Sequence, residues 1–567
     1  MKKDIQTFLF CRKWLSDGIG DSYKMWYNKY DAKTNSGKLL STPSMVLIKS
    51  PTGTGKTTFI LKKLVPYAAD KHRDILYFGN RIALNAQLKL AAANEEKLLE
   101  VRSKSGRELN EFEYNDFGNR IIVMNYQSLD THKKGYWRSL NPYYVIFDEA
   151  HFFIDDAIFN KKTYSNFRKL LSIYSDSALI FMTATPVDFE QIFDILVPKG
   201  INSHLYPEIY DALSNKNIVK YENSYSSKNY KLFAYRQKEE VIFKIKNTPK
   251  SEKWLIFVNS KRDGKEYLDK IKLLTDRKAR LLTAENKNTP IWDMLVHENR
   301  FKSDILIVTR VIDSGVSIDD STVKHIVLPF CTESDFIQML GRRRNAKNDL
   351  LNVYCEDISI QKICSKLNQV RMNCNILDML IEKDAISQED KELKIIKNEK
   401  IKNKLFSEKR RSFSNYIGLD SHGNLIYNPF AYYKLSTLYS FYCSLKDTYK
   451  NNPDFYFKYI KKWLRTNKPI NHIYSDGQND FEAFLKHYIG RLITKEDATL
   501  FYEAFQYYYK RYCVKKFKRN SALLDESLNI RKGTTQRKAT MNKSLKMLNL
   551  PYEIKKEKNC WVLRKTE

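Results

Sequence analysis

The sequence predicts an α/β protein with two tandem parallel-sheet units and a mostly α-helical region after them. Short apolar runs alternate with helical patterns through about the first 350 residues, which is typical of parallel sheets covered by helices. Beyond that point long polar helical stretches dominate and the alternation is lost. The length of 567 residues suggests three or four domains, and the 43% hydrophobic share is ample for their cores.

The predicted elements follow in order along the chain. Eight apolar runs are predicted to be strands, namely Met45–Lys49, Ile75–Phe78, Ile121–Met124, Val145–Phe147, Leu179–Met182, Trp254–Val258, Asp304–Val308 and His325–Leu328. Helical patterns begin at Thr57 and Ala83, and the alternation pauses over about 200–250. We therefore expect four parts: an N-terminal extension over 1–40, a first α/β domain over 41–200, a linker with a second α/β domain over 201–350, and an accessory region over 351–567.

The accessory region is the most basic part of the chain. It carries about 41 Lys and Arg against about 24 Asp and Glu. At its end a predicted helix over Met541–Leu548 is followed by two segments that could pair as a hairpin, Tyr552–Lys556 and Cys560–Lys565. A helix followed by a basic hairpin predicts a module that resembles a winged helix.

The net charge of +31, with a pI near 9.5, predicts attraction to polyanions, although a chain encoded by an AT-rich genome could also have this composition. None of the eight cysteines forms a C-x-x-C pair, so a zinc or iron–sulfur site has no support in the sequence. No apolar run approaches the roughly 18 residues of a membrane span. We expect a soluble protein of the cytoplasm.

A glycine-containing loop over Ser50–Thr58 lies between a predicted strand and a predicted helix, which is the setting of a phosphate-binding loop. Glycines let the backbone turn several N–H groups inward, and the helix N-terminus favours negative charge. Lys56 is expected to reach the β- and γ-phosphates of ATP, and the Thr57 hydroxyl to hold Mg²⁺. The full set of expected ATP contacts in the loop is Pro51, Thr52, Gly53, Thr54, Gly55, Lys56, Thr57 and Thr58. Taken alone, the loop could still be a surface turn with an incidental lysine.

Two adjacent carboxylates, Asp148 and Glu149, end the apolar strand Val145–Phe147. Because ligands of α/β sheets bind at the carboxyl ends of strands, both side chains are expected at the nucleotide. Asp148 would help to hold Mg²⁺, and Glu149 would polarise the water that attacks the γ-phosphate. An Asp–Glu pair at a strand end is often only a solvated turn, but its place about 90 residues after the loop favours catalysis.

These two segments resemble helicase superfamily 2, in particular its DEAH-box members. Further segments are similar to that family's motifs Ia, Ib, III, IV, V and VI in the family's order: Gly79–Gln87, Val123–Leu129, Phe181–Pro186, Ile256–Ser260, Thr309–Asp319 and Gln338–Arg344. The style of the motifs is also similar to helicases of low-GC bacteria, phages, plasmids and defence loci, and to viral origin-binding helicases. The resemblance implies two tandem RecA-like domains with ATP and Mg²⁺ between them.

The second domain is expected to complete the ATP site. An arginine that reaches across the cleft would neutralise charge developing on the γ-phosphoryl group. The resemblance implies catalytic roles for Gln338, Arg342 and Arg344, and ATP contacts for Asp313 and Gly315. Which arginine is the finger stays open, because the family's second arginine usually stands where this chain has Asn345. The residues implied to couple ATP state to domain closure are His151, Thr183 and Thr185.

Nucleic acid is expected to cross the tops of both α/β domains. The resemblance implies phosphate contacts by Arg81, Gln127, Asn259, Ser260 and Thr309. The cluster Tyr507–Tyr512 mixes rings with cations and could be a stacking surface, but an amphipathic helix with its tyrosines against a core is the favoured interpretation.

The leading hypothesis is therefore a nucleic-acid-dependent ATPase that translocates along or unwinds DNA, in replication, repair, or phage, plasmid or defence biology. DNA is favoured over RNA because Thr183–Pro186 is similar to motif III of several DNA helicases, and because no upstream adenine-reading glutamine motif is recognisable. Two alternatives are also ATP-dependent enzymes but differ in what they act on: an RNA helicase, or a duplex-DNA translocase that does not separate strands. A non-catalytic binding module is disfavoured by the complete set of catalytic side chains.

Overall fold

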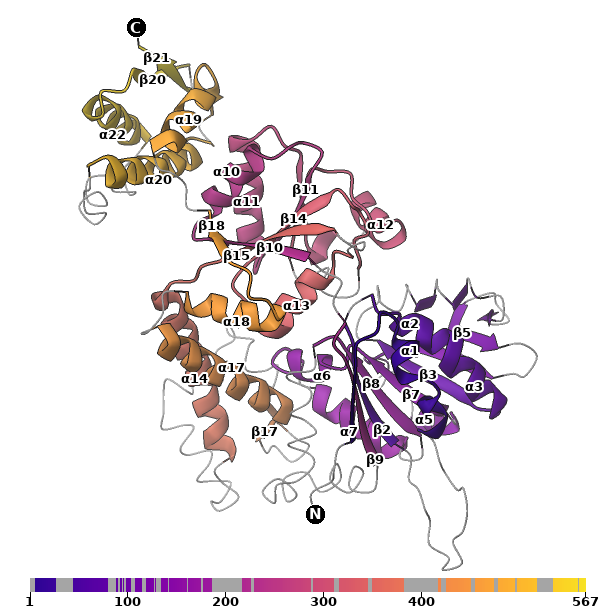
Figure 1. Cartoon of the computed structure of the whole chain (residues 1–567). Coiled ribbons are helices and arrows are strands. Elements are labelled where there is room, and N and C mark those ends of the chain that lie inside the picture. The colour runs from indigo at the N-terminus through magenta and orange to yellow at the C-terminus, as the bar shows by residue number, and fades with distance from the viewer. Residues whose placement is uncertain are drawn as a thin grey trace, which may run out of the picture.

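The structure is a computed structural model, and it describes 6–26, 44–51, 53–79, 88–89, 92–93, 95, 98–102, 108–114, 119–126, 128, 134–140, 142–160, 162–174, 177–185, 217–225, 229–286, 289–309, 316–344, 349–381, 417–419, 425–449, 454–473, 478–494, 497–517, 534–558 and 560–566. These residues form two sheet units, a helical region beside them and a small module at the C-terminal end (Figure 1). The expected α/β class, with two tandem RecA-like units followed by a mostly helical region, is confirmed.

The first unit is a sheet in which the described part of the chain places nine strands. In spatial order these are β1 (Gln6–Phe10), β9 (Asn217–Asn223), β2 (Ser44–Lys49), β8 (Ala178–Thr183), β7 (Pro142–Asp148), β3 (Asp74–Gly79), β6 (Arg120–Asn125), β5 (Glu108–Tyr114) and β4 (Leu98–Arg102). All neighbours pair in parallel except β4 with β5 and β5 with β6. The central strands β7 and β8 are buried along their whole length, as expected for a parallel sheet covered on both faces.

Short helices cover this sheet. They are α1 (Leu15–Ile19), a 3-10 turn (Ser22–Met25), α2 (Lys56–Phe59), α3 (Val65–Asp70), α5 (Lys134–Ser139), α6 (Phe152–Asp155) and α7 (Thr163–Ile173). A π-turn over Ile60–Leu64 joins α2 to α3. The turn widens immediately before Pro66, because proline has no N–H to donate and its ring crowds the preceding turn.

The second unit is a parallel sheet with seven strands among the described residues. Their order is β12 (Ala279–Leu282), β13 (Ile305–Val308), β11 (Lys253–Phe257), β14 (Val323–Leu328), β15 (Leu350–Glu356), β10 (Asn229–Tyr235) and β18 (Ile470–His472). The helices of this unit are α10 (Lys238–Lys246), α11 (Lys261–Leu274), a 3-10 turn (Ala284–Asn286), α12 (Pro290–His297) and α13 (Glu333–Gly341). Helix α13 carries the predicted motif VI and faces the first unit (Figure 1).

The region after β15 is mainly helical. It contains α14 (Ile360–Ile381), a hairpin of β16 (Ile417–Leu419) and β17 (Leu425–Tyr427), α17 (Pro429–Tyr449) and α18 (Phe455–Leu464). The C-terminal module follows with α19 (Gln478–Tyr488), β19 (Leu492–Ile493), α20 (Ala498–Phe517), α22 (Thr534–Met547), β20 (Tyr552–Glu557) and β21 (Cys560–Lys565). Strands β20 and β21 pair antiparallel in register Tyr552↔Lys565, so the expected helix and hairpin are both present.

The sheet pairings depart from the expected boundaries at three places. Strand β1 belongs to the first sheet and is not a separate extension, and β9, expected within the linker and second domain, lies in that same sheet between β1 and β2. Strand β18, from the accessory region, closes the edge of the second sheet beside β10. Two of the departures share a cause: β9 contains a lysine and two asparagines, and β18 has three residues, so neither gives a clear apolar run.

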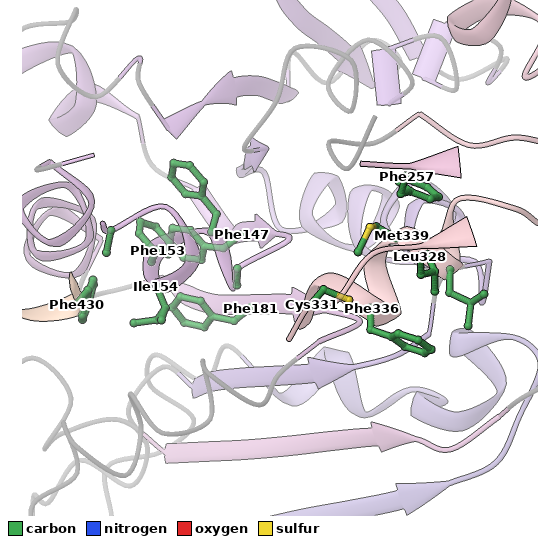
Figure 2. Packing of buried hydrophobic residues seen from close by; sticks show 14 of the residues in the cluster. Phe147, Phe153, Ile154, Phe181, Phe257, Leu328, Cys331, Phe336, Met339 and Phe430 are labelled. Carbon is green, nitrogen blue, oxygen red and sulfur yellow. The ribbon is translucent and has the colours of Figure 1, made fainter. Parts of the chain in front are cut away.

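The buried core is continuous from the first unit to the second. One cluster contains Phe147 and Phe181 of the first sheet, Phe336 and Met339 of α13, and Phe430 of α17 (Figure 2). A second cluster joins α10 and α11 to the C-terminal module. Its members include the rings of Tyr508, Tyr509 and Tyr512, so the interpretation of Tyr507–Tyr512 as a core-facing helix is confirmed for these three tyrosines.

Among the described residues no helix is both long and apolar enough to cross a membrane.

Candidate active site

The phosphate loop has the backbone that its sequence predicts. Strand β2 ends at Lys49, and α2 begins at Lys56 with Gly55 at its N-cap. Gly53 and Gly55 both have φ of +79°, a left-handed conformation that side chains rarely adopt. The Oγ1 atom of Thr54 donates to the Pro51 carbonyl at 2.8 Å, and this hydrogen bond within the loop stabilises its conformation. Thr52 lies outside the described residues.

Lys56 lies folded over the loop that it belongs to. Its Nζ donates to the carbonyl oxygens of Ser50 at 3.1 Å and Pro51 at 3.4 Å. These two carbonyl oxygens accept hydrogen bonds from the ammonium group, as phosphate oxygens are expected to do when ATP is bound. Thr57, at the second position of α2, is half-buried, whereas Thr58 is exposed.

Asp148 is held firmly at the carboxyl end of β7. Tyr77 donates its hydroxyl to Oδ2 at 2.7 Å, and the backbone N–H of Glu149 donates to Oδ1 at 3.0 Å. The hydroxyl of Tyr126 donates to the Asp148 carbonyl at 3.1 Å. Burial and the neighbouring charge of Glu149 raise the pKa of Asp148, and they outweigh the opposite effects of Lys56 and Tyr77. The buried carboxylate therefore gains from a further cation.

Glu149 has an unusual backbone and an unpartnered oxygen. Its φ is +50°, which is uncommon outside glycine and carries a cost of about 1–3 kcal/mol. Its Oε2 is buried and accepts no hydrogen bond from the described residues, although Nδ1 of His151 lies 3.4 Å away. Burial acts to raise the pKa of Glu149, but electrostatic interactions with His151, Lys56 and Arg342 outweigh it, so the pKa is lowered. The carboxylate is thus held in its ionised form.

The oxygen groups here fit Mg²⁺. Asp148 and Thr57 supply a carboxylate and a hydroxyl, which are the hard donors this ion prefers. The raised pKa of Asp148 indicates a carboxylate that a cation would stabilise, and Oε2 of Glu149 accepts no hydrogen bond from the described residues.

A hydrogen-bond network crosses from this edge of the first sheet to α13 of the second unit. Nδ1 of His151 lies 3.0 Å from Oγ1 of Thr183, which also accepts from the backbone N–H of Thr185 at 3.0 Å. Nε2 of His151 lies 2.6 Å from Nε2 of Gln338, so the amide can donate to the ring. Ser334, one turn before Gln338, lies 3.3 Å from Oγ1 of Thr185. The predicted coupling residues thus meet the predicted motif VI glutamine.

The three arginines after α13 have different environments. Arg342 is buried and close enough to lower the pKa of Glu149. Arg343 is 1% exposed, and it donates to the Val323 carbonyl at 3.2 Å and to Asp349 at 2.8 Å. Arg344 is exposed, and its backbone N–H donates to the Ile318 carbonyl. The geometry therefore favours Arg342 over Arg344 as the finger, and Arg343 is a structural residue and not part of a solvated cluster.

Only part of the predicted nucleic-acid surface is described. The amide of Asn259 donates to the Phe330 carbonyl at 3.4 Å, and Thr309 follows β13. Ser260 caps α11, because its Oγ accepts from the backbone N–H of Asp263 at 3.1 Å. Besides Thr52, four predicted site residues lie outside the described residues: Arg81, Gln127, Asp313 and Gly315.

Several residues at the site have no role in the sequence-based prediction. The indole of Trp14 lies against Gly55, since a Cβ at that glycine would be 3.0 Å from Cε3 of the ring. Nearby, the amide of Asn223 donates to the Arg12 carbonyl at 2.8 Å and to Oγ of Ser50 at 3.4 Å. No motif could have signalled these contacts. Ser334 could have been found, because it lies four residues before Gln338 on one helix face.

Comparison with known proteins gives one family match. Residues 22–188 match the family described as "Type III restriction enzyme, res subunit". No curated protein sequence matches the chain.

The chain is also similar to solved structures at low identity. Mss116p bound to single-stranded RNA and AMP-PNP is 11% identical with a TM-score of 0.44, over 95% of this chain and 94% of that one. Dbp5 of S. cerevisiae bound to RNA and ADP BeF3 is 14% identical with a TM-score of 0.38, over 55% and 79%. The helicase Lhr of Mycobacterium smegmatis bound to single-stranded DNA and AMP-PNP is 14% identical with a TM-score of 0.39, over 70% and 58%. These TM-scores are below 0.5 and add no weight to the assignment.

The family match and the geometry of the site concern the same residues. The match covers the phosphate loop, Asp148 and Glu149, which lie together at the carboxyl edge of a RecA-like sheet. A second RecA-like unit presents Gln338 and Arg342 to that edge. Residues 22–188, which carry the first half of this site, are thus similar to the family described as "Type III restriction enzyme, res subunit".

Proposed function

We propose that the chain is a nucleic-acid-dependent ATPase that translocates along or unwinds DNA in the cytoplasm. The observation that carries this proposal is the 2.6 Å contact between Gln338 of the second unit and His151, two residues after Glu149. An enzyme that only hydrolysed ATP would not need a neighbour of its catalytic carboxylate in contact with a second sheet unit. A motor needs such a contact, because closure of its two units must depend on the state of the nucleotide.

The residues divide the chemistry between them. Lys56 exchanges its bonds to the Ser50 and Pro51 carbonyls for phosphate oxygens, so binding costs little desolvation. Asp148 and Thr57 would hold Mg²⁺, which supplies charge neutralisation for phosphoryl transfer. Glu149, which its lowered pKa keeps ionised, orients the attacking water and accepts its proton. Arg342 stabilises the charge that develops on the γ-phosphoryl group.

DNA is the proposed substrate on two grounds. Thr183–Pro186 has the form of motif III found in several DNA helicases, and the charge of +31 suits a polyanion. Replication, repair, and phage, plasmid or defence biology are the settings in which we propose this motor acts.

The decisive experiment measures ATP turnover in the presence of single-stranded DNA, duplex DNA, forked DNA and RNA. We expect strong stimulation by DNA, and displacement of a labelled strand from a fork. Stimulation by RNA alone would replace DNA with RNA as the substrate, and stimulation by duplex DNA without displacement would indicate a translocase.

Two variants control this assay. Lys56→Ala removes the only charge that the loop contributes to the phosphates, so turnover should fall to background while the protein stays folded. Glu149→Gln should still bind ATP but not hydrolyse it. Turnover at background for the parent with every nucleic acid would refute the proposed function.

A further inference from the structure

Helix α17 of the accessory region packs against α14 and α18 and also contacts α6 and α7 of the first unit (Figure 1). At its beginning Asn428 donates its amide to Oγ1 of Thr163 at 2.8 Å and to the Asn160 carbonyl at 3.1 Å. The ring of Phe430 lies edge-on to Phe167 of α7, with centroids 5.4 Å apart. Figure 2 shows Phe430 beside Ile154 of α6. The first end of α17 is therefore fixed on the first unit.

The other end of α17 packs on the second unit. Phe441 and Tyr442 contact Phe330, which follows β14. Helix α18 continues this contact, since Tyr456 donates its hydroxyl to the Cys331 carbonyl at 3.1 Å. A single helix thus connects the two parts whose relative position defines the ATP cleft.

Between these ends, one lysine joins the cleft network. Lys434 is 7% exposed, and its Nζ donates to Oδ1 of Asp155 at 2.7 Å. The other oxygen of that carboxylate accepts from Oγ of Ser334 on α13 at 3.0 Å. Ser334 and Gln338 share a helix face, and Gln338 contacts His151. A chain of polar contacts therefore runs from α17, through both units, to the residue beside Glu149.

We propose that Lys434 is a positioning residue for ATP hydrolysis, which acts by fixing the Asp155 carboxylate that holds Ser334 and α13 against the first unit. The inference depends on the proposed ATPase function. It adds that the accessory region takes part in closure of the cleft and is not only an additional nucleic-acid surface.

The physical reason is the position of the pair, in which Lys434 is buried and Asp155 is half-buried. A half-buried carboxylate has limited access to water, and here each of its oxygens accepts a hydrogen bond from a different part of the chain. Without the ammonium group, Asp155 would turn towards water or bind a proton, and Ser334 would exchange the carboxylate for the longer contact with Oγ1 of Thr185. Gln338 would then approach His151 in a less defined way, with Lys56 and the phosphate loop unchanged.

The test compares Lys434→Met, which keeps the aliphatic stem, with Lys434→Arg, which keeps the charge. Lys446→Met is the matched control, because Lys446 is an exposed lysine on the same helix. For Lys434→Met we expect the stimulated kcat to fall about tenfold, while KM for ATP changes less than about twofold. Lys434→Arg should recover most of the loss, and Lys446→Met should match the parent.

Hydrogen exchange gives a readout that does not need turnover. In Lys434→Met the amides of Glu333–Gly341 should exchange about fivefold faster, with no change in β2 or β7. Asp155→Asn should have the same effect, and the double variant should be no worse than either single one. If Lys434→Met does not fold, Asp155→Asn and Lys434→Arg still report on the link.

The outcomes separate the two proposals. Unchanged exchange in α13 for both Lys434→Met and Asp155→Asn would overturn the role of Lys434, whatever happens to turnover. A parent protein without ATPase activity would refute the proposed function, and the exchange measurement would still decide whether α17 holds α13. A loss of kcat that Lys434→Arg does not recover would mean that the site requires the shape of lysine and not its charge, against the inference.

Discussion

Arg342, Arg343 and Arg344 follow one another in the chain, yet each side chain has a different environment. Arg342 is buried near Glu149, Arg343 is paired with Asp349, and Arg344 is exposed. The cause is local geometry: α13 ends at Gly341, and Arg343 then forms a bridge to Ile318, which turns its side chain away from its neighbours. Charge alone therefore does not identify an arginine finger.

Replacing Arg342 with Gln should reduce turnover by about 10³-fold, because a finger of this kind contributes at least that much to the rate. Arg344→Gln should have a much smaller effect. Stimulated ATP hydrolysis at saturating nucleic acid distinguishes the two variants. A larger loss with Arg344→Gln would exchange their assignments.

Replacing Arg343 with Gln should destabilise the fold by about 2–4 kcal/mol, because it breaks a buried ion pair and leaves the Val323 carbonyl without its donor. Thermal or urea unfolding measures the loss, with Arg344→Gln as the control that should unfold like the parent. An unchanged midpoint for Arg343→Gln would show that Lys324 alone satisfies Asp349.

The sequence predicted those site residues whose chemistry is local. Lys56, Asp148 and Glu149 each lie close to the end of a strand. A few neighbouring residues therefore predict both the backbone conformation and the chemical role of each side chain. Trp14 could not be predicted in this way, because its contact with Gly55 depends on how segments about 40 residues apart pack. These site roles stay predictions until variants are measured.

At the scale of elements, strands with a local apolar signal were predicted, and strands whose place depends on distant partners were missed. The buried strands β7 and β8 are continuous apolar runs, which burial on both faces requires. Strand β9 lies beside β2 in the same sheet, but among its residues 218–223 three are buried, namely Ile218, Tyr221 and Asn223. Its partners, and not its own hydrophobicity, determine its place.

The contact of the C-terminal module with the second unit contains a pH-sensitive element. His487 of α19 has a buried Nε2 with no hydrogen bond from the described residues. Burial, Lys246 and Arg491 together lower the pKa of His487 to about 4. The folded state thus resists protonation of this ring, while the unfolded chain takes up a proton near pH 6.5.

Stability should therefore be fully present above about pH 6.5 and should fall as the pH drops towards 4. Partial exposure of the ring limits the loss to about 1–2 kcal/mol. His487→Gln should lose less stability than the parent between pH 7 and pH 4.5, as measured by urea unfolding. Equal losses in the two proteins would assign the acid sensitivity to other groups.

At the scale of the whole molecule, the accessory region has two roles that its composition does not separate. Tyr508, Tyr509 and Tyr512 belong to a hydrophobic core cluster, and Arg511 pairs with buried Glu240. The basic and aromatic residues of this part of α20 therefore contribute to packing. The exposed lysines of α22 and β21 remain candidates for contact with phosphates.

Replacing Lys543, Lys546 and Lys565 with Gln should weaken DNA binding and lower its salt dependence. Each lysine that contacts a phosphate contributes about 0.9 to the log–log slope on duplex DNA. A matched set at the amino edge of the second unit, Lys250→Gln, Lys278→Gln and Lys302→Gln, removes the same charge where no nucleic acid is expected. Equal slopes for the two sets would place the DNA elsewhere.

The pairing of β1 with β9 also constrains how the chain acquires its structure. Gln6 lies beside Val219, and Leu232 of β10 lies beside Ile470 of β18, so both sheets are completed by segments more than 200 residues apart. On the ribosome, the N-terminal strand would wait without a partner until more than 220 residues have been made, and the second sheet would wait for residue 472. Such remote closure makes folding slow, and it exposes two unpaired strand edges during synthesis. We expect nascent chains released before residue 223 to be captured by chaperones or to aggregate, because they cannot yet bury the edge of β2.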